Sequence, residues 1–101
     1  MRLTAQQQAT VRATVAETFG SDAQVRLFGS RVDDTKRGGD IDLLVTTNER
    51  DVQTLMRCEI ALLTKLQNQL GEQKIDLLLD YPSRTVRSPI LGIAMQTGIL
   101  L

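Results

Sequence analysis

The sequence predicts an α+β fold in which a small mixed β-sheet is flanked by helices. Segments with the apolar spacing of amphipathic helices are separated by short segments with the alternating or continuous apolar pattern of strands. These signals follow one another as helix, strand, loop, strand, helix, strand, helix, with no internal repeat or linker. At 101 residues, the chain is expected to form one domain over residues 1–101.

The chain begins with the signals of a helix followed by a strand. Thr4 and Gln7 have the spacing of a capping box, in which each side chain binds the other residue's backbone amide. The helix is expected to run to about Phe19, because Gly20 suits a helix C-terminus. Residues 23–28 then alternate between two faces and predict a short strand.

The middle of the chain predicts a polar loop, a buried strand and a long helix. The loop covers residues 29–39 and the strand residues 40–47, whose run of apolar residues indicates burial on both faces. Asn48 is expected to cap a helix that continues to about Leu70 with a broad apolar stripe. Gly71 is expected to end this helix.

A third strand and a last helix complete the predicted fold. Residues 74–80 have apolar residues at alternate positions and predict a strand, which the turn-forming residues 81–83 end. Ser88 as N-cap and Pro89 at the first helical position predict a helix that stops near Gly98. The apolar tail after Gly98 is expected either to pack on the core or to contact a partner.

Composition excludes several classes of function. Lys plus Arg equal Asp plus Glu at 12 each, and aromatic residues make up 3%, so neither a basic field nor base-stacking side chains favour direct nucleic-acid binding. The net charge of zero favours association into a homo- or hetero-oligomer. The chain has no histidine, which excludes histidine-based metal sites and catalytic triads. Any metal must therefore bind to carboxylates, which prefer Mg²⁺ or Mn²⁺.

The single cysteine and the apolar runs bear on location. Cys58 cannot form an internal disulfide and suits a reducing, cytoplasmic environment, where we expect it to be a small apolar residue on a helix. No apolar run approaches the ~20 residues of a membrane span, and the first residues do not have the pattern of a signal peptide. We therefore expect no membrane association.

Three aspartates are the candidate metal ligands. Asp40 and Asp42 are two residues apart on a predicted strand, so their carboxylates point to one face. Such a pair alone is often only a solvated strand end. Asp76 lies in a very apolar strand, where an unpaired charge is costly. If the two strands are neighbours, three carboxylates meet on one face and suit a site with two metal ions for phosphoryl or nucleotidyl transfer. Asp76 is also positioned to accept a proton from an incoming hydroxyl.

A glycine-serine turn is the candidate phosphate site. Gly29 allows close approach of backbone to a ligand, and Ser30 offers an amide and a hydroxyl to a phosphate. Alone, the pair is also typical of an ordinary strand-to-helix turn. Arg31 adjoins the turn and can bind phosphate oxygens.

The order of these residues resembles a known signature. Gly29-Ser30-Arg31, the loop, and then residues 40–45, DIDLLV, resemble the Gly-Ser…Asp-x-Asp signature of the polymerase-β-like nucleotidyltransferase superfamily. The small size resembles the minimal nucleotidyltransferases (MNT), including the antitoxins paired with HEPN-domain toxins. Asp76 falls where that family has its third carboxylate, and residues 88–101 look like its closing helix and tail. The resemblance covers nearly the whole chain.

The resemblance implies a fold, a reaction and a partner. It implies the polymerase-β-like nucleotidyltransferase fold and Mg²⁺-dependent transfer of AMP from ATP, with pyrophosphate released. Gly29 and Ser30 would hold the triphosphate, and Asp40, Asp42 and Asp76 would bind two Mg²⁺ ions. In similar antitoxins the acceptor is a tyrosine of the HEPN toxin, an RNase that modification and complex formation silence.

One departure and one alternative accompany this resemblance. Many members carry Ser-Asp just before the Ile-Asp. This chain has Gly38-Gly39 before Asp40, so the loop between the glycine-serine turn and the carboxylates has a glycine at the position of that serine.

The alternative function is a non-catalytic binding module of the same fold, which neutralises or scaffolds a partner by complex formation.

Overall fold

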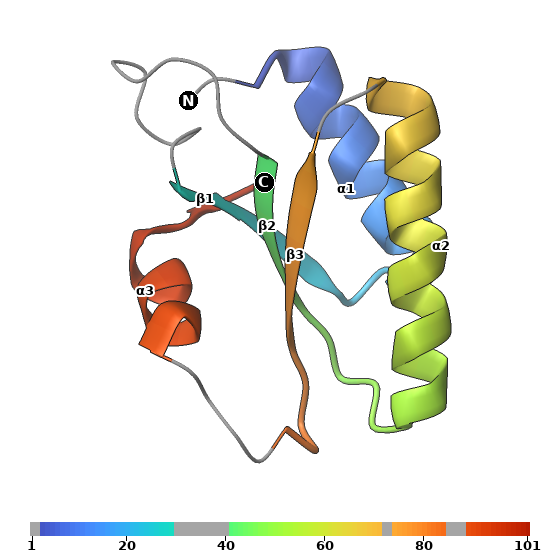
Figure 1. The fold of residues 1–101 in the computed structure, drawn as a ribbon, viewed down its shortest axis with the longest axis vertical. Coiled ribbons are helices and arrows are strands. Elements are labelled where there is room, and N and C mark those ends of the chain that lie inside the picture. The colour runs from blue at the N-terminus through green and yellow to red at the C-terminus, as the bar shows by residue number, and fades with distance from the viewer. Residues whose placement is uncertain (1–2, 30–40, 72–73, 85–88) are drawn as a thin grey trace.

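The computed structural model describes residues 3–29, 41–71, 74–84 and 89–101. These residues form an α+β fold, as the sequence predicts, with three helices and four strands interspersed along the chain (Figure 1). The elements are α1 (Ala5–Phe19), β1 (Gln24–Phe28), β2 (Ile41–Thr46), α2 (Val52–Leu70), β3 (Ile75–Asp80), α3 (Pro89–Thr97) and β4 (Ile99–Leu100).

Helix α1 begins and ends where its sequence signals predict. The Gln7 backbone N–H donates to Thr4 Oγ1 at 3.0 Å, and the Thr4 N–H donates to Gln7 Oε1 at 2.9 Å. This reciprocal pair is the predicted capping box, which satisfies amides that have no partner within the helix. At the other end, Gly20 has a φ of 102° and its N–H donates to Ala16 O at 3.1 Å.

The start of α2 differs from the prediction. Asp51, not Asn48, caps this helix, and its carboxylate accepts from the Thr54 N–H at 3.3 Å and from the Thr54 hydroxyl at 2.7 Å. The preceding turn is held by Glu49, whose Oε1 accepts from the backbone amides of the next two residues. The chain therefore uses residues 47–50 to leave the sheet before the helix begins. Gly71 ends the helix as predicted.

The sheet has the strand order β3-β2-β1-β4. β2 and β3 are parallel, with α2 as the crossover between them, and the β1–β2 and β1–β4 pairs are antiparallel, so the sheet is mixed as predicted. β4 was not predicted. It places Ile99 opposite Leu27 and Leu100 opposite Arg26. The tail thus packs on the sheet in part, with Leu101 against the core while Leu100 is 54% exposed.

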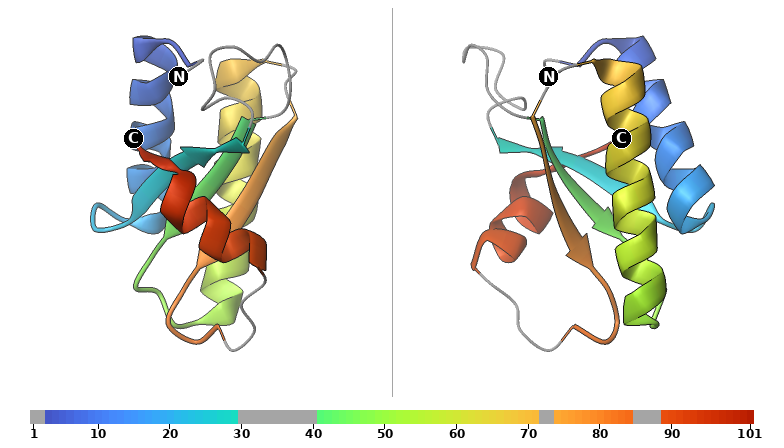
Figure 2. Two further views of the ribbon diagram at one scale, coloured as in Figure 1. Left: turned by 90° about the vertical axis from the view of Figure 1, so that its left-hand side faces the viewer. Right: turned by 45° about the vertical axis from the view of Figure 1, so that its right-hand side comes forward.

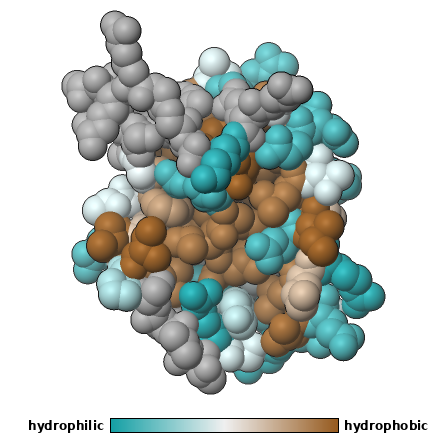
Figure 3. Space-filling model, viewed as in Figure 1, coloured by the Kyte–Doolittle hydropathy of each residue, from teal (hydrophilic) through white to brown (hydrophobic). Residues whose placement is uncertain are grey.

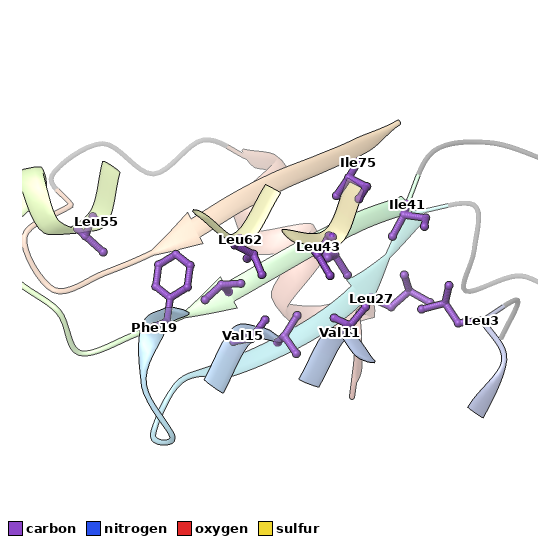
Figure 4. Close-up of a cluster of buried hydrophobic side chains, with 13 residues drawn as sticks. Leu3, Val11, Val15, Phe19, Leu27, Ile41, Leu43, Leu55, Leu62 and Ile75 are labelled. Carbon is purple, nitrogen blue, oxygen red and sulfur yellow. The ribbon is translucent and has the colours of Figure 1, made fainter. Parts of the chain in front are cut away.

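Helices cover both faces of the sheet. α1 and α2 lie together on one face and α3 lies on the other (Figures 1 and 2). The larger core is formed between the sheet and the α1–α2 pair (Figure 4), with Cys58 packed at its margin as an ordinary apolar neighbour. Its buried residues are Leu3, Val11, Val15, Phe19, Val25, Leu27, Ile41, Leu43, Val45, Leu55, Leu62, Leu66 and Ile75.

A second, smaller apolar cluster lies on the α3 face. Phe28 of β1, Leu44 of β2 and Leu91 and Ala94 of α3 form it, with Leu78 of β3 packed at its margin. β2 is therefore buried on both faces, as its apolar run predicts, because Leu43 and Leu44 point to opposite sides and are each 0% exposed.

Candidate functional site

Three of the predicted site residues lie side by side at one end of the sheet. Gly29 directly follows β1, Asp42 is the second residue of β2, and Asp76 is the second residue of β3. In the register of the sheet, Asp42 is the partner of Phe28 on one side and of Asp76 on the other. The strand neighbourhood on which the predicted carboxylate site depends is therefore present.

The two aspartates point to the face of the sheet that α3 covers. Paired residues of neighbouring strands share a face, and Phe28, the partner of Asp42, belongs to the α3 cluster together with Leu44. Asp42 is half-buried and Asp76 is exposed. One side of the site thus rests on packed apolar residues, and the other is open to solvent.

Gly29 lies directly beneath the Asp42 carboxylate. A Cβ added to Gly29 would lie 2.2 Å from Asp42 Oδ2 and 3.1 Å from its Cγ, so a side chain fits there only if the Asp42 carboxylate moves. Gly29 also has a φ of 76°, which residues with a Cβ rarely adopt. Steric space and backbone conformation both require glycine at the point where the predicted phosphate turn meets the predicted metal ligand.

The other predicted site residues are outside the described residues. These are Ser30, Arg31 and Asp40, together with the Gly38-Gly39 sequence. Within residues 3–29, 41–71, 74–84 and 89–101, no three Cys, Asp or Glu side chains gather closely enough to hold a metal ion. The described part of the site therefore contributes two carboxylates, Asp42 and Asp76, and the backbone of Gly29.

A comparison with known families decides the identity of this fold. The family model of the nucleotidyltransferase domain matches residues 9–91. The chain belongs to this family. The match runs from α1 into α3, so it spans β1, β2 and β3 and the positions of every predicted site residue. No curated protein sequence matches the chain.

The carboxylates of this nucleotidyltransferase domain fit a divalent cation. Neighbouring strands lie ~4.8 Å apart, so two aspartates paired across them carry like charges at short range on one face. A hard cation with oxygen ligands, such as Mg²⁺, relieves this repulsion and uses the donor type that both residues offer. Together with the adjacent glycine backbone, the arrangement suits a metal-bound phosphate chain.

Phe28 is the site neighbour that the sequence did not single out. It pairs with Asp42 in the sheet and is 7% exposed, in contact with the α3 cluster. The sequence pattern of β1 could have indicated this position, because its alternation places Phe28 on the face of Arg26, away from Val25 and Leu27. Its burial anchors the row of site residues to α3.

Among the described residues, no helix is both long and apolar enough to cross a membrane.

Proposed function

We propose that this nucleotidyltransferase domain transfers AMP from ATP to a protein hydroxyl group in a Mg²⁺-dependent reaction. The observation that carries the proposal is the row formed by Asp42 and Asp76, paired in register, with the Asp42 carboxylate directly above Gly29. Carboxylates support cation binding and a glycine backbone supports close approach of phosphate. Nucleotidyl transfer needs the two together.

Each residue of the row has a role in this proposal. Gly29, Ser30 and Arg31 hold the triphosphate, and Asp40, Asp42 and Asp76 hold two Mg²⁺ ions. The metal, when bound, supplies charge neutralisation to the phosphate oxygens. The hydroxyl oxygen of the acceptor forms a bond to the α-phosphorus while the bond from that phosphorus to the β-phosphate oxygen breaks. Pyrophosphate leaves, and Asp76 takes the hydroxyl proton.

We propose a HEPN-family RNase toxin as the protein acceptor, with this chain as its antitoxin. The resemblance to MNT antitoxins supports this choice, and a tyrosine of the toxin is the acceptor residue that it implies. The exposure of Asp76 on β3, the outermost strand on its side of the sheet, also supports a macromolecular acceptor, because a side chain of another protein can reach it.

Labelling by ATP tests the proposal. The chain is incubated with α-³²P-ATP, Mg²⁺ and the product of the adjacent gene, and labelled protein is separated on a denaturing gel. We expect label on the partner with the wild-type chain, and none with Asp42→Asn or with EDTA in place of Mg²⁺. Asp22→Asn is the matched control, since it removes an exposed carboxylate charge near the opposite end of β1 and should leave labelling unchanged.

Two results would contradict the enzymatic proposal. One is the absence of label with wild type although the two proteins form a complex, which would assign the chain to the non-catalytic binding class. The other is undiminished labelling by Asp42→Asn and Asp76→Asn, which would place the chemistry elsewhere in the chain.

A further inference from the structure

Helix α3 carries no charged residue, yet only one side of it is buried. Its nine residues are apolar except for Gln96 and Thr97 at its end, and the buried ones are Leu91 and Ala94. On its solvent side, two isoleucines are about half exposed, Ile90 at 49% and Ile93 at 56%. A helix that is apolar all round is usually covered on every side, so the open side of α3 is expected to contact another molecule.

This open side of α3 lies on the same face of the sheet as the proposed site. Leu78 of β3 is half-buried and packs against the α3 cluster, so it joins the helix to the outermost strand. Asp76 precedes Leu78 by two residues and points to the same face, ~6.5–7 Å away along the strand. Figure 3 shows hydrophobic side chains at the position of α3 beside those over β3. We call Ile90, Ile93 and Leu78 the α3 surface.

The backbone edge of β3 offers less to a partner than these side chains do. The Asp80 carbonyl accepts from the Thr47 N–H, so the Leu79 carbonyl, one residue earlier, points away from β2. Arg84 Nη1 already donates to this Leu79 oxygen at 2.8 Å. An added strand would meet the Arg84 guanidinium, whereas a partner that packs on the α3 surface leaves it in place. The structure therefore favours docking through apolar side chains.

The proposed reaction identifies the molecule that covers the α3 surface. Asp76 takes the proton of the acceptor hydroxyl, so the acceptor protein must contact β3 at Asp76 and cover the residues beside it on that face. A second exposed apolar stripe, on α2, lies on the opposite face of the sheet (Figure 2). A protein bound there would have to reach around the edge of the sheet to meet Asp76.

We propose that the α3 surface is the docking site of the acceptor protein, which covers it with an uncharged, apolar face and presents its hydroxyl group to Asp76 from the border of that face. The inference rests on the proposed function, since it concerns the partner of the same site. Tyrosine suits such a border because its ring is apolar and its hydroxyl is polar. The row of site residues then holds the nucleotide, and α3 selects the protein that receives AMP.

Neutral substitutions on α3 test the docking site by binding. Calorimetry without ATP measures the affinity of the adjacent gene's product for wild type, Ile93→Gln and Ile90→Gln. Each variant places a polar amide in the apolar contact, and we expect Kd to rise at least about tenfold. Glutamine is a good helix former and adds no charge near the carboxylates, so the fold and Mg²⁺-ATP affinity should be unchanged.

Ile60→Gln is the matched control, because Ile60 is 64% exposed on α2, on the other face of the sheet. This variant should bind the partner as wild type does. Labelling from α-³²P-ATP gives a second readout, in which the KM for the protein acceptor should rise at least about tenfold in Ile93→Gln and stay unchanged in Ile60→Gln.

Three results would overturn the docking site while the proposed reaction stands. The first is binding and labelling by both α3 variants as strong as by wild type. The second is an equal loss in Ile60→Gln, which would show that the acceptor does not distinguish the two faces. The third is a dimer of the chain alone, detected by sedimentation, that Ile93→Gln dissociates, which would assign the α3 surface to a second copy.

Two further results concern the proposed reaction. A partner that binds wild type but not the α3 variants, and that is never labelled, would overturn the reaction and keep the docking site. A partner that wild type does not bind at all would overturn both.

Discussion

The two faces of the sheet differ in what they bury. The face under α1 and α2 carries an unbroken apolar core, with Ile41, Leu43 and Val45 of β2 all 0% exposed. The face under α3 carries Leu44 in a small apolar cluster and Asp42 at its margin. One strand thus contributes to the main core on one side and carries a carboxylate of the proposed site on the other. The difference shows how a short domain can hold charged residues rigidly without a charge in its main core.

The core face should respond most strongly to substitution. Leu43→Ala removes a fully buried side chain between β2 and the helices, and we expect a loss of about 2–5 kcal/mol in the free energy of unfolding. Nucleotidyl transfer by the molecules that stay folded should be retained. Urea denaturation combined with activity per folded molecule measures both. A loss of activity without loss of stability would break the proposed division between the two faces.

The carboxylates of the α3 face should show the reverse behaviour. Asp42→Asn should reduce nucleotidyl transfer at least about 100-fold, as expected when a direct metal ligand is lost. Mg²⁺ should raise the Tm of wild type but leave that of Asp42→Asn nearly unchanged, because a ligand stabilises only the state that binds it. Thermal scans with and without Mg²⁺ check this. A variant that Mg²⁺ stabilises as much as wild type would contradict the role of Asp42 as a metal ligand.

Substitution of Gly29 should lower both stability and nucleotidyl transfer. Gly29→Ala places a Cβ against the Asp42 carboxylate in a backbone conformation that favours glycine, so the carboxylate must move. We expect a loss of about 1–2 kcal/mol in stability and about tenfold in transfer. Gly71→Ala is the matched control, since its φ is also positive, at 83°, but a Cβ there meets no atom within 4 Å. Equal loss of transfer in both variants would show that strain alone is responsible.

The smallest effect concerns the start of α2, far from the site. The Thr54 hydroxyl, which donates to the Asp51 carboxylate, lowers the pKa of Asp51. A lowered folded-state pKa adds stability above the unfolded pKa of ~3.9, and this contribution disappears as the pH falls through the folded pKa. Asp51→Asn keeps a capping side chain but does not titrate there. Its unfolding free energy should therefore fall less than that of wild type in the acid range, as measured by denaturation at several pH values.

The sequence predicted most helices and strands, but it did not predict the start of α2 or the short strand β4. The capping box of Thr4 and Gln7 and the terminal Gly20 and Gly71 are local signals, and the helix ends they predict are confirmed. The cap of α2 was predicted three residues early, because Asn and Asp are both good N-caps and only the path out of the sheet selects Asp51. β4 has two residues, which is too short for a periodic signal.

The site illustrates the same limit. The types and spacing of Asp42 and Asp76 indicated a carboxylate pair on a sheet. Their pairing in register depends on the length of the α2 crossover and on how the helix packs, which no local pattern specifies. The contact between Gly29 and the Asp42 carboxylate likewise arises only when β1 and β2 align. Sequence patterns therefore predicted which residue types a site would use, and the tertiary fold supplied the relative positions of Gly29, Asp42 and Asp76.

Binding of ATP in a double-variant cycle tests the central claim, that Asp42 and Asp76 form one site. Titration calorimetry of Mg²⁺-ATP compares wild type, Asp42→Asn, Asp76→Asn and the double variant. We predict that wild type binds ATP only with the metal, that each single variant loses at least about tenfold in affinity, and that the double variant loses little more than either. Losses that add independently, or ATP binding that neither substitution changes, would contradict the account.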